Sequence, residues 1–215
     1  MAFKIILCAL SAYLVGCINP AFIIGKIKGM DIRKKGSGNA GASNALILMG
    51  KSVALFSALF DIVKAAAVMW LAPVIFTDVP VIAEVAGAAC TIGHIFPIFM
   101  KFKGGKGLAC LGGILLAIDW RLLLILLAVE IVVVLVVDYI CIVPITASVA
   151  FPLIYGLMER NLLGALLLCI LPVVMLIKHL ENIRRILRGK EVHFSYLWKK
   201  DAEIERVGGD PSNFS

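Results

Sequence analysis

Charged residues are scarce in this chain, and their scarcity excludes most soluble folds. Asp, Glu, Lys and Arg make up 16% of the 215 residues and apolar residues make up 61%, with a mean hydropathy of +1.02. Soluble domains carry roughly 25% charged and 45–50% apolar residues, so the composition indicates an integral membrane protein. Sustained apolar runs, without the alternation of barrel strands, predict an all-helical fold.

Several familiar functional patterns are also missing. The six cysteines stand in apolar surroundings and include no close Cys-x-x-Cys pair, so neither a metal site nor a disulfide framework is predicted. A Walker phosphate loop beginning at Gly36 would need lysine where Ala42 stands. No half of the chain repeats the other, which gives no support to a transporter that works by alternating access.

Apolar runs of about 20 residues, the length that crosses a bilayer, recur along the chain. Seven spans are predicted, and six is the alternative count because the fourth is too short to cross fully. The first run also resembles a lipoprotein signal ending at Cys17, although a first membrane helix is the preferred interpretation. The predicted spans are 5–25, 52–76, 79–100, 107–119, 121–138, 139–158 and 161–178.

Lysine and arginine predict the orientation, because short cytoplasmic loops are enriched in them. They cluster after the first, third and last spans, whereas the opposite turns carry one cation or none. Seven spans then place the amino terminus outside and the carboxyl terminus in the cytoplasm. We expect one multispanning domain, residues 1–191, and a cytoplasmic tail, residues 192–215. Topology and phosphate binding explain the net charge of +7, so nucleic acid is not a predicted partner.

Charges inside the spans must face protein or water, because a lone ion at the bilayer centre costs about 2.5–3.5 kcal/mol. Asp61 and Lys64 are three residues apart on one predicted helix and are expected to pair. Glu130 has no partner that the sequence reveals. Glu84, near the outer end of its span, is expected to be wetted.

Three polar, glycine-bearing segments interrupt the apolar sequence, and all fall on the predicted cytoplasmic side. They are 36–44 (GSGNAGASN), 93–107 (GHIFPIFMKFKGGKG) and 178–191 (KHLENIRRILRGKE). The first suits a concave nest of backbone amides that binds phosphate. A flexible linker with a helix cap at Ser43 or Asn44 is the alternative.

The second and third segments add cations and a histidine face. Lys106 stands between glycines and can reach an anionic ligand, whereas topology alone would explain the lysines but not the glycines. In the third segment His179, Asn182 and Arg185 are three residues apart and share one helix face. Arg185 is also expected to pair with Glu181 one turn away.

The order of these motifs, SGNxGxxN, then GHxFPxFxxFKGGKG, then KHxENIxRxxxGxE, resembles that of the bacterial acyl-phosphate:glycerol-3-phosphate acyltransferases, the PlsY family. The resemblance runs from about residue 5 to Glu191. It implies a seven-helix inner-membrane enzyme of phospholipid biosynthesis, which moves a fatty acyl group from acyl phosphate to the 1-hydroxyl of glycerol 3-phosphate. The implied products are lysophosphatidic acid and phosphate. It implies no cofactor and no metal, and the enzyme that makes acyl phosphate is a candidate partner.

Carried over position by position, the resemblance implies catalytic roles for Ser37, Lys106 and His179. Lys106 and the glycine amides would hold phosphate, Ser37 and Asn182 would orient the acceptor, and the proton would go to His179 or to the departing phosphate. The implied substrate-binding residues are Gly36, Gly38, Asn39, Gly41, Ser43, Asn44, His94, Gly104, Gly105, Gly107, Asn182 and Glu191.

One position departs from the family pattern in a way that matters. Ile47 stands where the family usually has an arginine that helps to bind the acceptor phosphate, and an arginine clamp is not replaced by an apolar side chain. Lys35, Lys51 or Arg184 are candidate substitutes. The alternatives are a transporter of an organic phosphate, or a paralogue of the acyltransferases with a changed acceptor or little activity.

Overall fold

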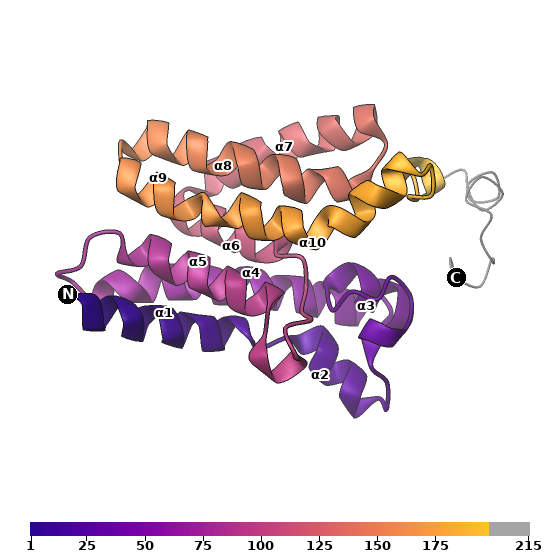
Figure 1. Ribbon diagram of the computed structural model, residues 1–215, viewed down its shortest axis with the longest axis horizontal. Helices are drawn as coiled ribbons and strands as arrows, with labels where there is room; N and C mark the ends of the chain where they lie inside the picture. The colour runs from indigo at the N-terminus through magenta and orange to yellow at the C-terminus, as the bar shows by residue number, and fades with distance from the viewer. Residues whose placement is uncertain (198–215) are drawn as a thin grey trace.

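Helices account for most of the described chain, residues 1–197 of a computed structural model (Figure 1). Of the predicted tail 192–215, residues 198–215 lie outside the described part. The α-helices are α1 (Ala2–Gly16), α2 (Pro20–Ile27), α3 (Ala42–Met49), α4 (Lys51–Ile75), α5 (Ile82–Ile95), α6 (Leu108–Ile118), α7 (Trp120–Val137), α8 (Val143–Glu159), α9 (Leu162–Leu168) and α10 (Ile170–Leu187). The 3-10 helices are η1 (Ile32–Lys34), η2 (Ile98–Met100), η3 (Ile140–Ile142) and η4 (Phe194–Leu197).

Among the described residues, five segments are long and apolar enough to cross a membrane, and a sixth is obtained if α1 and α2 count as one span bent by 42°. The predicted span 107–119 is α6, whose 11 residues extend about 16 Å. The hydrocarbon core of a bilayer is about 30 Å thick. The predicted count of seven full spans is therefore not confirmed, although the all-helical, multi-pass membrane fold is.

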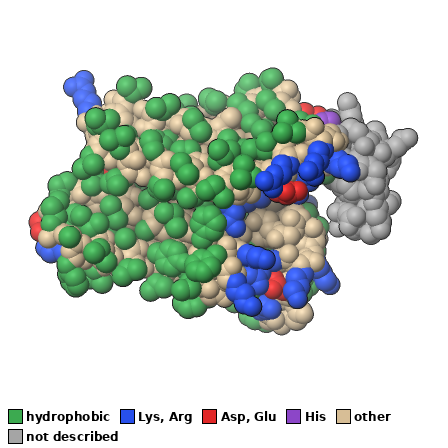
Figure 2. Space-filling view, in the orientation of Figure 1, with side chains coloured by type: hydrophobic (Ala, Val, Ile, Leu, Met, Phe, Trp, Pro, Cys, Tyr) green, Lys and Arg blue, Asp and Glu red, His purple; other side chains and the backbone are tan. Residues whose placement is uncertain are grey.

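Apolar side chains cover the flanks of the bundle, whereas Lys and Arg gather toward one end (Figure 2). Val74, Val136 and Leu157 are 72%, 78% and 81% exposed. Large apolar surfaces of this kind are rare on soluble monomers and are expected against lipid. The cationic end is the one at which α2, α3 and the last turns of α10 lie (Figures 1 and 2).

Helices α1 and α5 touch along their backbones. A Cβ atom at Gly16 would lie 2.0 Å from the carbonyl oxygen of Cys90, and one at Gly93 would lie 2.1 Å from that of Tyr13. Small residues allow membrane helices to approach this closely. The contact fixes the end of α5, from which the second polar segment leaves the bundle.

A buried ion pair joins α4 to the break between α1 and α2. Lys64 Nζ lies 2.6 Å from Asp61 Oδ1, which confirms the predicted pair, and both side chains are nearly inaccessible. Nζ also donates to the carbonyl oxygens of Gly16, at 3.0 Å, and Ile18, at 2.7 Å. Since the break leaves such carbonyls without helical partners, Lys64 satisfies groups that lipid cannot.

Glu130 and Glu84, the other acidic residues discussed above, also have partners. Thr146 Oγ1 donates to Glu130 Oε2 at 2.7 Å. Glu84 is 5% exposed and accepts hydrogen bonds from the Tyr155 hydroxyl and from Asn161 Nδ2. The expectation that Glu84 is wetted is wrong, because α8 and the turn after it cover the carboxylate.

Replacing Lys64 tests how much the buried pair contributes. Lys64→Met leaves the Asp61 carboxylate buried without its cation, so the free energy of unfolding should fall by about 3–5 kcal/mol. The unfolding temperature in detergent should drop on the order of 10 °C. Lys51→Met, at the exposed start of the same helix, should change the free energy by no more than about 0.5 kcal/mol. Equal unfolding temperatures for the two variants would contradict this account.

Candidate active site

The first segment is a loop folded around one buried amide. Asn44 Nδ2 lies within hydrogen-bonding distance of the carbonyl oxygens of Ile32, Lys35 and Asn39, at 2.7, 3.1 and 2.9 Å, and Asn44 Oδ1 accepts from the Ser37 N–H at 2.9 Å. Asn44 is fully buried. It therefore shapes the loop from within and neither caps α3, which begins at Ala42, nor presents a free polar atom to a substrate.

Several of the glycine amides that were predicted to hold phosphate have backbone partners in this structure. The N–H of Gly38 donates to the carbonyl of Lys35, that of Gly104 to Ile95 and that of Gly105 to His94. Backbone donors at or near the hydrocarbon must find partners inside the protein, and these loops satisfy their own. These three N–H groups are therefore not free donors, and phosphate binding by them stays a prediction.

Arg33 connects the first segment to the second. Its guanidinium donates twice to Asp31, with Nε–Oδ1 and Nη2–Oδ2 distances of 2.9 and 2.7 Å, and Nη1 donates to the carbonyl oxygen of Met100 at 2.6 Å. The hydrogen bonds from Arg33 hold the pKa of Asp31 well below its usual value. Met100 also packs with Ala40 of the first segment and with Ala45 directly after it, so the two segments form one surface.

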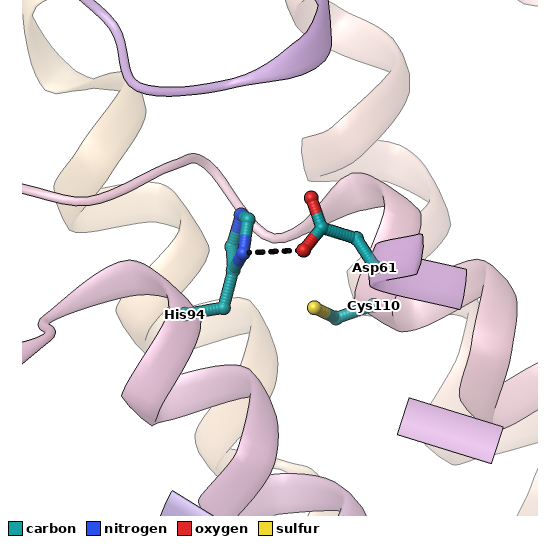
Figure 3. A group of neighbouring side chains, drawn as sticks. All are labelled: Asp61, His94 and Cys110. Atoms are coloured by element: carbon teal, nitrogen blue, oxygen red, sulfur yellow. Dashed lines mark ion pairs between the residues drawn. The ribbon is translucent and has the colours of Figure 1, made fainter. Parts of the chain in front are cut away.

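The second segment is anchored to the buried ion pair through His94. The imidazole Nδ1 lies 3.2 Å from Asp61 Oδ1 (Figure 3) and 3.2 Å from Lys64 Nζ. On its far side the ring touches the Gly105 backbone so closely that a Cβ there would lie 2.0 Å from Nε2. His94 is 3% exposed and positions the loop next to Lys106, while its role in substrate binding stays a prediction.

Asp61, His94 and Cys110 also have the donor atoms of a metal site, since these atoms lie within 4.8 Å of one another (Figure 3). Lys64 Nζ, at 2.6 Å from Asp61 and 3.2 Å from His94, is the cation that this cluster already holds. A metal ion beside that ammonium would meet strong repulsion. We therefore assign the cluster to structure.

Lys106 joins the second segment to the third. Its Nζ donates to Asn182 Oδ1 at 2.7 Å, and Asn182 Nδ2 donates to Glu191 Oε1 at 2.6 Å. The other carboxylate oxygen of Glu191 accepts from Arg185 Nε at 2.6 Å. Burial lowers the pKa of Lys106, and the charge of Glu191 opposes that shift. The predicted Glu181–Arg185 pair is wrong, because Glu181 pairs with Arg184.

His179 lies fully buried one turn before Asn182 on α10. Its Nδ1 is 2.7 Å from the carbonyl oxygen of Met175, and since a carbonyl only accepts, Nδ1 carries the proton. Within residues 1–197, Nε2 has no hydrogen-bonding partner. His179 shares a face of α10 with Asn182, to which Lys106 donates, so an unsatisfied acceptor lies on the helix face that the second segment contacts.

Comparison with known proteins agrees with the motifs. The family model described as glycerol-3-phosphate acyltransferase matches residues 6–189. The chain belongs to this family. It is 35% identical to glycerol-3-phosphate acyltransferase 1 of Oceanobacillus iheyensis, over 92% of this chain and 98% of the relative. It is 38% identical to the Shewanella loihica enzyme, over 85% and 89% of the two chains.

Two solved structures of a family member have the same fold. Crystal structures of PlsY, an integral membrane glycerol 3-phosphate acyltransferase, match with TM-scores of 0.81 for the glycerol 3-phosphate form and 0.79 for the lysophosphatidic acid form. The identities are 30% and 28%, and each match covers 90% of this chain and 96% of the other. The fold and its membrane location are therefore those of the acyltransferase family.

Within this acyltransferase fold, the predicted residues separate into two groups. Lys106, His179, Asn182 and Glu191 come together, whereas Ser37 and Ser43 are exposed on the first segment. Sequence reasoning gave no site role to Arg33, although its place beside the first motif was a signal. Ile47 is 46% exposed on α3. Of the remaining predicted residues, Asn44 lies in α3 and His94 in the last turn of α5. The others lie in the loops: Gly36, Gly38, Asn39, Gly41, Gly104, Gly105 and Gly107.

Two cavities in the described bundle lie away from Lys106. One, of about 170 Å³, is lined by Glu84, Tyr155 and Glu159 at the other end of the molecule. The second is an apolar groove of about 510 Å³ between α5 and the α9–α10 pair. The groove includes Ile92, directly before the second segment, and Val173, about one turn before the third.

A methyl group at Gly105 tests the contact with His94. Because the new Cβ would overlap the imidazole, Gly105→Ala should displace Lys106. Glycerol-3-phosphate acyltransferase activity should then fall at least tenfold. Acyl transfer to glycerol 3-phosphate by purified protein measures this. Gly112→Ala on α6 is the matched control, since its Cβ would meet only ordinary contacts at 3.9 Å. Unchanged activity in Gly105→Ala would refute the positioning role.

Proposed function

We propose that this protein transfers a fatty acyl group from acyl phosphate to the 1-hydroxyl of glycerol 3-phosphate, yielding lysophosphatidic acid and inorganic phosphate. The observation that carries the proposal is the junction of Lys106, Asn182 and Glu191 beside the unpartnered Nε2 of His179. The names of the matched structures, a glycerol 3-phosphate form and a lysophosphatidic acid form, support the acceptor and the product.

The reaction needs no enzyme nucleophile, because acyl phosphate is already an activated mixed anhydride. The acceptor oxygen forms a bond to the acyl carbon, the bond from that carbon to the phosphate oxygen breaks, and phosphate departs with the electron pair. The hydroxyl proton goes to His179 Nε2 or to the departing phosphate. Holding two anions at one place and orienting one hydroxyl can supply much of the rate acceleration.

In this proposal, cationic side chains bind the phosphate groups of the substrates. Lys106 has three N–H donors, of which Asn182 takes one, so others are directed to a phosphate. Ser37, exposed on the first segment, orients the acceptor together with Asn182. Arg33 holds the first segment on Met100. With Ile47 in place of the family arginine, exposed Lys35 and Lys51 are the cations assigned to the acceptor phosphate.

The apolar groove between α5 and α9–α10 is the proposed place of the acyl chain. It is lined by alanine and branched aliphatic side chains and lies at the depth of the spans. Phe96 and Lys178 lie at its inner end, where Lys178 Nζ is 5.0 Å from the centre of the Phe96 ring. A chain in this groove would bring its head toward Lys106 and leave its tail in lipid.

The positive-inside pattern supports a bacterial inner-membrane location with the three segments, the carboxyl terminus and both phosphorylated substrates on the cytoplasmic side. The amino terminus is then outside. Residues 1–191 act as one domain, with 192–215 as a cytoplasmic tail. A soluble enzyme that makes acyl phosphate would deliver its product to this same side.

Product formation distinguishes an acyltransferase from a transporter of an organic phosphate. Detergent-purified protein given acyl phosphate and glycerol 3-phosphate should release inorganic phosphate and lysophosphatidic acid in equal amounts, measured by a phosphate assay and mass spectrometry. Omitting glycerol 3-phosphate is the control. Uptake of glycerol 3-phosphate into proteoliposomes without either product would favour the transporter. The absence of both products and of uptake would favour a paralogue of little activity.

Variants of the two central residues test the site assignment. Lys106→Met and His179→Ala should each lower kcat/KM by about 10²–10³, because each removes a group that acts on developing charge or on the proton. Lys190→Met, at an exposed position of the same end, should retain the activity of the natural chain. Near-normal rates in both central variants would remove the assignment while leaving the family membership intact.

A further inference from the structure

The end of the described chain is fastened to the turn between α7 and α8. Asp138 closes α7 in the left-handed conformation, with φ of 60°. Its carboxylate accepts the Ser195 N–H at 2.7 Å and the Ser195 hydroxyl at 2.8 Å, and its carbonyl oxygen accepts the Phe194 N–H at 2.7 Å. Three bonds to two successive residues hold this part of the chain in one register; we name Asp138, Phe194 and Ser195 the tail clamp.

A second contact reinforces the tail clamp. The rings of Tyr139 and His193 pack with their centres 4.7 Å apart, and His193 Nε2 lies 2.9 Å from the Tyr139 hydroxyl. Two successive residues at the start of the turn, Asp138 and Tyr139, thus hold the segment that follows Glu191. The family model ends at residue 189, so His193, Phe194 and Ser195 lie beyond the part of the chain that it matches, whereas Asp138 and Tyr139 lie within it.

The tail clamp determines where Glu191 can lie. Glu191 precedes Phe194 by three residues and is 8% exposed, with one oxygen on Asn182 and the other on Arg185. Because α10 ends at Leu187, only the short stretch 188–193 connects Glu191 to elements fixed on either side. Releasing the later end would let Glu191 leave Asn182, whose carbonyl oxygen holds Lys106.

We propose that Asp138 is a positioning residue for the acyl transfer, acting through the tail clamp to hold Glu191 against Asn182 and so to aim Lys106 at the substrate phosphate. The inference rests on the proposed function. Asp138 itself touches no substrate in this account. Its effect passes through Glu191, which gives it a kinetic signature that a general loss of stability would not produce.

The experiment compares Asp138→Gly with Asp138→Asn in the full chain. Glycine tolerates the left-handed backbone but removes both carboxylate acceptors, so kcat/KM for glycerol 3-phosphate should fall about tenfold, mainly through KM. Asparagine also tolerates this backbone and keeps an acceptor for the Ser195 N–H, so it should stay within about twofold of the natural chain. In a Glu191→Gln background, Asp138→Gly should add little further loss, because the two act in one chain of contacts.

Asp119→Gly is the matched control. Asp119 caps the other end of α7 by accepting the Arg121 N–H at 2.8 Å, so this variant loses a comparable contact far from Lys106 and should keep natural kinetics. Unchanged kcat/KM in Asp138→Gly, or an equal loss with and without Glu191→Gln, would overturn the inference.

Hydrogen exchange separates a failure of this inference from a failure of the proposed function. Deuterium uptake over residues 188–195 should rise in Asp138→Gly and not in Asp119→Gly, whatever reaction the protein performs. A natural chain without acyl transfer would refute the proposed function and with it the kinetic role. Unchanged uptake in Asp138→Gly would refute the tail clamp alone.

Discussion

The active end of this protein depends on the contacts of the buried Lys64 ammonium. A lone charge in the bilayer is costly, but Nζ here meets the Asp61 carboxylate, two carbonyl oxygens at the end of α1 and the ring of His94. One cation therefore ties α4, α5 and the break between α1 and α2 together. Since His94 presses against Gly105, the position of Lys106 follows from an ion pair inside the membrane.

The glycines of the polar segments serve packing more than ligand binding. Gly104 and Gly105 lie against the backbone and ring at the end of α5 and give their N–H groups to its last carbonyls. In the loop of the first segment the Asn44 side chain satisfies backbone groups, accepting from the Ser37 N–H and donating to the carbonyl oxygen of Ile32. Loops that descend toward lipid must satisfy their backbone internally, which leaves side chains to meet the anions.

The sequence predicted those features that depend on overall composition or on residues close together in the chain. The membrane class, the multi-pass helical fold and the Asp61–Lys64 pair follow from hydropathy and from spacing on one helix. The sequence also predicted that the fourth span is too short to cross fully, which the 11 residues of α6 confirm, but the contact of its preceding loop with His94 was hidden. The partners of Glu84 and Arg185 were likewise hidden, since Tyr155 and Glu191 reach them only through the tertiary fold.

The neutral amide between Lys106 and Glu191 explains how a cation can be oriented without being neutralised. A direct Lys106–Glu191 ion pair would hold the ammonium equally well, but the carboxylate would compete with any phosphate for it. The N–H₂ group of Asn182 donates to Glu191, and its carbonyl oxygen accepts from Lys106. Arg185 forms an ion pair with the other carboxylate oxygen of Glu191. Glu191 therefore does not neutralise Lys106, whose positive charge stays available to the phosphate of the proposed reaction, and its position is set by α10 and by the chain that follows it.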